Sequence, residues 1–269
     1  MGRLIASFFL LPIMIEAQQA CLEEEYPLAS QTDYYATSSG ARDRQGILAI
    51  LNQQQSVSTV DPEARQYVET AGARLTAPFA AQGLYKFTFV LYDDSQPLNA
   101  PWYGLLNRRV PTIRSHVYAM PGGIVLVPVS LFDVTATESE FAAALARGVG
   151  HVVLRHFTRF ANKPMVSIQP IPPAGRQQRS PGFTETLLFS RSLEKEADCA
   201  AVGLMAAARF NPEALLIYAT RREASFDTSD FRVRSMQRII AKLAPQDYNA
   251  GDGRQFEMLK ARVRRRSVE

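Results

Sequence analysis

The chain has 269 residues, of which 46% are hydrophobic and 21% charged, so it can bury the core of one globular domain. The formal net charge is only +4, and much of the excess lies at residues 260–266, as is typical of a solvated basic helix end. Basic and aromatic residues are not interleaved as on nucleic-acid-binding surfaces. The composition excludes wholesale disorder, and we expect no nucleic-acid partner.

The first residues predict an export signal. Arg3 precedes an apolar run over 4–15, and small residues follow that run. The run is too short to span a bilayer, which needs about 20 residues. We therefore expect residues 1–20 to be a cleaved signal peptide and the protein to be periplasmic or secreted. A retained membrane anchor and lipidation of Cys21 stay open as alternatives, although the two glutamines before Cys21 fit a lipidation signal poorly.

Cysteine usage predicts no disulfide framework. The chain holds two cysteines, one at the signal boundary and one, Cys199, inside a predicted helix. We expect Cys199 to be a small buried apolar residue. Stability must then come from the core.

The N-terminal half predicts helices followed by a strand. Residues 21–60 form a loose segment with a short helix near 44–51. A longer helix over 61–79 begins at Asp61-Pro62, since aspartate caps helices and proline suits the first turn. Residues 85–92 alternate and are rich in β-forming side chains, which predicts a strand.

The middle of the chain predicts a strand pair and a long helix. Strands over 113–120 and 124–129 flank the turn Pro121-Gly122-Gly123. Thr137 and Glu140 form a capping box, so a helix should begin near 138 and continue to about 160. These strands, with the one before them, predict a small and mostly antiparallel sheet.

The C-terminal half predicts a loop and then helices. Residues 163–182 contain five prolines and two glycines, which predicts a loop. A helix over 184–208 follows. Three further helices are expected at 212–223, 230–243 and 253–264. The order of helices, sheet and helices predicts an α+β domain over 61–269.

Three segments, in this order, carry a resemblance to a known family. They are YAMPGGIVLV at 118–127, ALARGVGHVVLRH at 144–156 and SRSLEKEAD at 190–198. Together they resemble the HtpX-type zinc metallopeptidases, gluzincins related to the CAAX prenyl protease, over roughly 63–243. The resemblance implies a metallopeptidase-like domain with a small sheet, a long active-site helix and C-terminal helices. It implies proteolysis as the ancestral activity.

The active-site helix departs from the family pattern H-E-x-x-H. Arg147 stands at the first histidine, Gly148 at the glutamate, and only the second histidine remains, as His151. A guanidinium offers no lone pair to zinc, and glycine offers no base. Catalytic zinc needs three protein ligands and a general base for its water. We therefore expect no catalytic residue and no zinc cofactor, or only weak zinc binding.

The downstream half of the site is retained. By the resemblance, Glu194 stands at the third zinc ligand and Asp198 at the carboxylate that orients a ligating histidine. His151 and Glu194 are thus vestigial zinc-ligand positions. Without an ion the two carboxylates lack a positive partner, so we predict that the Arg147 guanidinium pairs with Glu194 or Asp198.

The other histidines are not expected to bind metal. His156 comes five residues after His151, about 140° around a continuous helix, so the two should not share a face. His116 lies just before the strand pair and is expected to be exposed or hydrogen-bonded. Neither residue rebuilds a zinc site.

Three functions stay open at this point. The favoured hypothesis is a non-catalytic protein that binds extended or unfolded polypeptide by strand addition along Ile124, Val125, Leu126 and Val127. The second is a zinc-dependent metalloendopeptidase with altered or residual activity. The third is an assembly partner of envelope proteins such as an active paralogue.

Overall fold

The computed structural model describes residues 38–80, 86–95, 116–120, 122–156, 191–222, 231–244, 247–248 and 253–266. The expected signal peptide, Cys21 and the proline-rich loop lie outside these residues. In the described part of the chain, no helix is long and apolar enough to cross a membrane. The elements are α2 (Ser38–Asn52), α3 (Gln55–Ser58), α4 (Pro62–Ala80), β1 (Thr88–Tyr92), β2 (Tyr118–Met120), β3 (Ile124–Pro128), α6 (Leu131–Val134), α7 (Glu138–Val153), α10 (Arg191–Ala207), α11 (Glu213–Arg222), α12 (Phe231–Ile240) and α13 (Arg254–Arg266).

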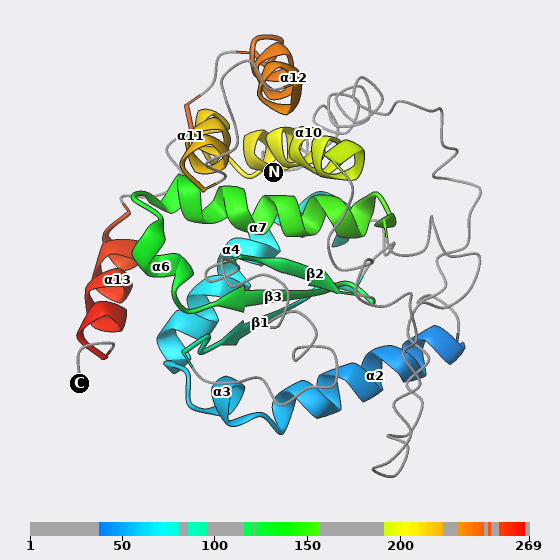
Figure 1. Ribbon diagram of the computed structural model, residues 1–269, viewed down its shortest axis with the longest axis vertical. Helices are drawn as coiled ribbons and strands as arrows, with labels where there is room; N and C mark the ends of the chain where they lie inside the picture. Colours follow the sequence, from blue (N-terminus) through cyan, green and yellow to red (C-terminus); the bar gives the residue numbers. More distant parts are fainter. Residues whose placement is uncertain are drawn as a thin grey trace, which may run out of the picture.

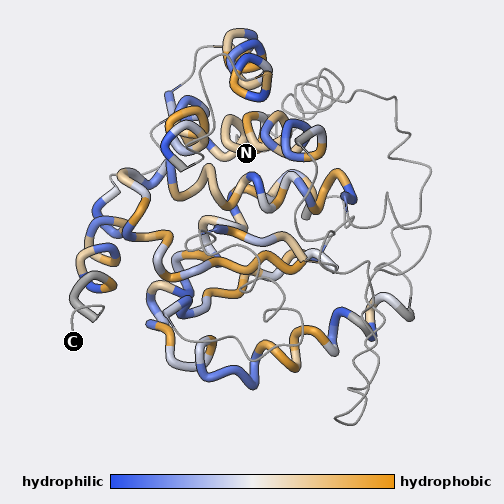
Figure 2. Tube along the Cα trace, in the orientation of Figure 1, coloured by the Kyte–Doolittle hydropathy of each residue, from blue (hydrophilic) through white to orange (hydrophobic). Residues whose placement is uncertain are grey.

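Helices on both sides of a small sheet confirm the α+β prediction. In Figure 1, α7 lies between the sheet and α10, while α2 and α3 lie on the side of the sheet away from α7. Figure 2 shows that the strands are the most continuously hydrophobic part, whereas α2 and α12 alternate between polar and apolar residues. This pattern is typical of a buried sheet covered by amphipathic helices.

The sheet is mixed rather than mostly antiparallel. Its strand order is β1-β3-β2, with β3 antiparallel to β2 and parallel to β1. The β2–β3 pair follows from the tight turn at Gly122 and Gly123, whose φ angles of 80° and 76° suit glycine. The long connection from β1 to β2 has room to reverse the chain direction, so β1 is free to pair in parallel.

The central position of β3 corrects the expected peptide-binding strand. Each residue of β3 pairs with β1, and Ile124, Val125 and Leu126 also pair with β2. Strand addition needs an edge with unpaired backbone groups. Ile124, Val125 and Leu126 therefore do not offer such an edge, and these three residues and Val127 are all buried in the core.

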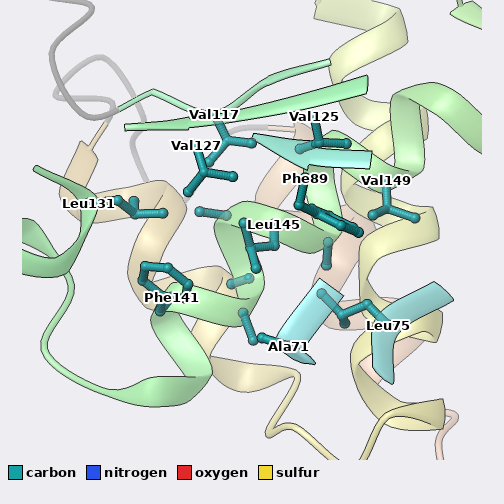
Figure 3. Packing of buried hydrophobic residues seen from close by; sticks show 14 of the residues in the cluster. Ala71, Leu75, Phe89, Val117, Val125, Val127, Leu131, Phe141, Leu145 and Val149 are labelled. Carbon is teal, nitrogen blue, oxygen red and sulfur yellow. The ribbon is translucent and has the colours of Figure 1, made fainter. Parts of the chain in front are cut away.

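The core lies between the sheet and the helices α4 and α7. Figure 3 shows Phe89 and Val125 of the sheet beside Leu145 and Val149 of α7 and Leu75 of α4. A Cβ at Gly148 would lie 3.0 Å from side-chain atoms of Val125 and of Val117, just before β2. Helix α7 is buried from Glu140 to Val153, and most of these residues are apolar, as expected for a buried helix.

The start of α7 was predicted correctly, and its end was not. The Thr137 side chain accepts a hydrogen bond from the Glu140 amide, and Glu140 accepts one from the Ala136 amide, as a capping arrangement should. The helix was expected to continue to 160, but it ends at Val153. Arg155 then takes a left-handed φ of 55°, which redirects the chain.

Helices α7 and α10 approach closely at Gly150. A Cβ at this position would lie 2.7 Å from the Ala197 carbonyl oxygen, so only glycine allows this separation. The close approach places side chains of the two helices opposite one another across a short gap.

Cys199 on α10 is fully buried, as predicted. The expectation that it acts only as a small apolar residue was wrong, because it is disulfide-bonded. The other cysteine of the chain, Cys21, lies outside the described residues.

Asp61 caps α4 and makes stability depend on pH. Burial would raise its pKa, but hydrogen bonds from the Ala64 and Glu63 amides and the charge of Arg262 lower it overall. Because the pKa is lower in the folded state, the ionised Asp61 stabilises the fold at pH values above its unfolded-state pKa of about 4. This contribution is lost as the pH falls through the folded-state pKa. Asp61→Ala should cost about 1 kcal/mol at pH 7.

The control for that prediction is Asp61→Asn, which retains the cap without the charge. Urea unfolding should be measured at pH 7 and pH 3. The difference in the free energy of unfolding between wild type and Asp61→Ala should be smaller at pH 3. The difference in the free energy of unfolding between Asp61→Asn and Asp61→Ala should be the same at both pH values. If the difference between wild type and Asp61→Ala did not change with pH, the charge of Asp61 would not stabilise the fold.

Candidate functional site

The candidate site lies where α7, α10 and α12 pack together. Helix α7 contributes Arg147 and His151, which are one turn apart, and α10 contributes Glu194 and Asp198 with the same spacing. Residues four apart share a helix face, so the two pairs face each other. Helix α12 adds Arg232.

Arg147 pairs with both retained carboxylates, as predicted. Its Nη2 donates to Glu194 Oε2 at 2.6 Å, and its Nε lies 2.8 Å from Asp198 Oδ1. The contact to Asp198 has the distance of an ion pair without the direction of a hydrogen bond. Arg147 is only 6% exposed, so this is a buried ion pair in the interior and not a surface contact.

Arg232 completes the cluster, and sequence reasoning missed it. Its Nε and Nη2 lie 2.7 and 2.6 Å from Asp198 Oδ2, and its Nη2 lies 3.6 Å from Glu194 Oε2. The available signal was position: Arg232 shares the buried face of α12 with Met236 and Ile239. A basic residue on an apolar helix face predicts a buried acidic partner.

The histidines meet, contrary to the expectation that they do not share a face. His151 Nδ1 lies 2.8 Å from His156 Nδ1, and His156 Nε2 lies 3.2 Å from Glu196 Oε2. The expectation assumed a continuous helix, but α7 ends at Val153 and the turn at Arg155 brings His156 back. The ring of His116 instead packs edge-on against the ring of Tyr118.

One arrangement of the ring protons satisfies the contacts of both histidines. His156 Nε2 donates to the Glu196 carboxylate, so His156 Nδ1 is left to accept from His151 Nδ1. His151 Nε2 then faces Glu194 Oε1 at 3.6 Å. A line of polar contacts thus runs from Glu196 through both imidazoles to Glu194.

The site is electrostatically balanced around Glu194. Burial alone would raise the pKa of this carboxyl, but the neighbouring His151, Arg147 and Arg232 outweigh burial and hold the pKa well below its usual value. Glu194 is therefore ionised at neutral pH. Its side chain is 18% exposed, the most accessible of the clustered carboxylates and arginines.

The residues present do not fit a catalytic zinc ion. His151 Nε2 and Glu194 Oε1 are 3.6 Å apart, close to the roughly 3.3 Å that separates two ligands of a tetrahedral zinc. Arg147, which by the resemblance stands at the first histidine ligand, already contacts the same glutamate through its guanidinium. Among the described residues, no group of three or more histidine, cysteine or acidic side chains is arranged to hold a metal.

Gly148, which by the resemblance stands at the position of a glutamate base, has little free space around it. Gly148 packs against Val117 and Val125, and a Cβ there would meet both at 3.0 Å. A glutamate side chain would need these valines to move. Gly148 thus allows close packing of α7 on the sheet.

Comparison with known proteins finds a distant relative. No family model matches the chain. The chain is 28% identical over 174 residues to a beta-barrel assembly-enhancing protease from Yersinia pestis.

The chain resembles part of a protease. The match covers 58% of this chain, and it spans about a third (32%) of the length of that protein. With the three motifs, this likeness supports a metallopeptidase-like scaffold at most, and it does not single out the HtpX-type family.

Proposed function

We propose that this protein is an exported, metallopeptidase-like protein that does not hydrolyse peptides and acts by binding extended or unfolded polypeptide or an envelope partner. The observation that carries the proposal is the buried contact of Arg147 with Glu194 and Asp198. The first zinc-ligand position of the family thereby supplies a fixed positive charge. The same contact occupies the carboxylate that would otherwise bind metal.

The arrangement supports the proposed absence of hydrolytic chemistry. A metallopeptidase needs a metal-bound water and a base that accepts its proton, and each supplies several orders of magnitude in rate. Arg147 stays protonated and cannot replace a ligand, and Gly148 cannot replace the base. What remains is a folded scaffold on which polypeptide binding does not depend on the metal.

The alternative is a zinc-dependent metalloendopeptidase with altered or residual activity. The distance from His151 Nε2 to Glu194 Oε1 favours it, because two ligands remain near the spacing that zinc spans. The contact of Arg147 with Glu194 at 2.6 Å opposes it. Two ligands and no base give weak binding at best.

Polypeptide binding by strand addition would need an outer strand. Because β3 is paired on both sides, β1 and β2 are the outer strands of the described sheet. Of these, β2 packs against α7, the helix that carries Arg147. We therefore propose that an extended polypeptide pairs with the backbone edge of β2, whose own side chains are buried, in place of Ile124 to Val127.

The test uses the full mature protein, beginning at about Cys21. We expect well under one zinc per chain by elemental analysis, no cleavage of unfolded casein with added zinc, and capture of unfolded casein on immobilised protein. Folded proteins of the same charge serve as the capture control. Chelator-sensitive cleavage that survives rigorous purification would establish the alternative, and absence of casein capture would favour the envelope partner.

A further inference from the structure

We infer that Arg147 and Arg232 act together as the replacement for a divalent cation, and that Arg232 is the residue that keeps zinc out even when histidine is restored at position 147. The inference goes beyond the proposed binding role. It concerns the charge balance of the site and takes from the proposal only the metallopeptidase-like scaffold.

The charges of the cluster match those of a metal site. Glu194 and Asp198 bring two negative charges, and the two guanidiniums bring two positive charges, the same as one zinc ion. The two arginines reach the carboxylates from different helices, α7 and α12. Neither arginine alone balances both carboxylates.

The contacts divide the carboxylate oxygens between the arginines. Asp198 Oδ1 faces Arg147 at 2.8 Å, and Asp198 Oδ2 faces Arg232 at 2.6 Å. Glu194 Oε2 contacts Arg147 at 2.6 Å and lies 3.6 Å from Arg232. Asp198 is 0% exposed and Arg232 is 3% exposed, so water screens this arrangement little.

Arg147→His alone therefore does not recreate a metal site. It adds a third possible ligand, an imidazole, to His151 and Glu194, but Arg232 still places a fixed cation within 3.6 Å of Glu194. A zinc ion at a ligand distance of about 2.0–2.2 Å from Glu194 would lie beside that guanidinium and be repelled by it. Removing the Arg232 charge lifts the repulsion and leaves carboxylates that need a cation.

The experiment compares zinc binding by three variants of the full mature protein. They are Arg147→His, Arg147→His with Arg232→Gln, and Arg147→His with Arg238→Gln as a matched control. Arg238 lies on the exposed face of the same helix as Arg232. Zinc affinity is measured by competition with a chelating dye, and the thermal midpoint is measured with and without zinc.

We expect the Arg232→Gln double variant to bind one zinc at least about tenfold more tightly than the other two, a difference of ~1.4 kcal/mol. Its thermal midpoint should rise on adding zinc. If it folds only when zinc is present, that dependence supports the inference equally.

Two results would overturn the inference. One is equal zinc affinity in Arg147→His with and without Arg232→Gln. The other is a double variant that neither binds zinc nor recovers its fold in zinc. Casein capture by the unmodified protein tests the binding role separately, so failure of one leaves the other standing.

Discussion

Asp198→Ala should destabilise the folded protein by about 3–5 kcal/mol at neutral pH, the range measured when one partner of a buried ion pair is removed. Asp198 is fully buried and holds Arg147 and Arg232 through different oxygens. Its removal leaves two buried guanidiniums with Glu194 alone between them. Because domains are stable by only about 5–15 kcal/mol, a large share of the stability would be lost. Urea unfolding followed by circular dichroism measures the change.

The matched control is Glu63→Ala. Glu63 also pairs with an arginine, Arg262 at 2.9 Å, but its side chain is 62% exposed. Surface pairs contribute little, so this variant should unfold close to wild type. Asp198→Asn should fall between the two, because it keeps the shape and some hydrogen bonds without the charge. Equal midpoints for Asp198→Ala and Glu63→Ala would show that the cluster does not stabilise the fold.

Arg147→Ala is expected to cost about 3 kcal/mol, the lower end of that range, since Arg232 continues to hold Asp198. The loss comes from leaving the partly buried Glu194 carboxylate beside His151 with fewer positive charges around it. A partly buried arginine would give a loss of about 1–3 kcal/mol. Arg147 is almost wholly buried, so we expect a loss at the top of that range.

Arg221→Ala is the control for that prediction. Arg221 contacts Glu140 at 2.7 Å, as short as the contacts of Arg147, but its side chain is 47% exposed. Its removal should cost about 1 kcal/mol or less. Thermal and urea unfolding of both variants would decide the matter. A cost for Arg147→Ala no greater than for Arg221→Ala would mean that Arg147 is not a substitute for the ion.

The sequence by itself determined the features that depend on local geometry. The caps at Asp61 and Thr137 mark helix starts because they satisfy the first free amides of a helix. The pairing of Arg147 with Glu194 and Asp198 was also predictable. Residues four apart share a helix face, and the family motifs indicate which faces meet.

Tertiary structure alone decided the rest. The central place of β3 depends on which strand pairs beside which, and β1 reaches it through a long connection that carries no pairing signal. The contact of His156 with His151 depends on where α7 ends. The chain turns at Arg155, which has a left-handed φ, and no glycine or proline at this point indicates the turn in the sequence. Arg232 joined the site because α12 packs on α10. Such contacts are set by how buried surfaces fit together, and local periodicity does not record that fit.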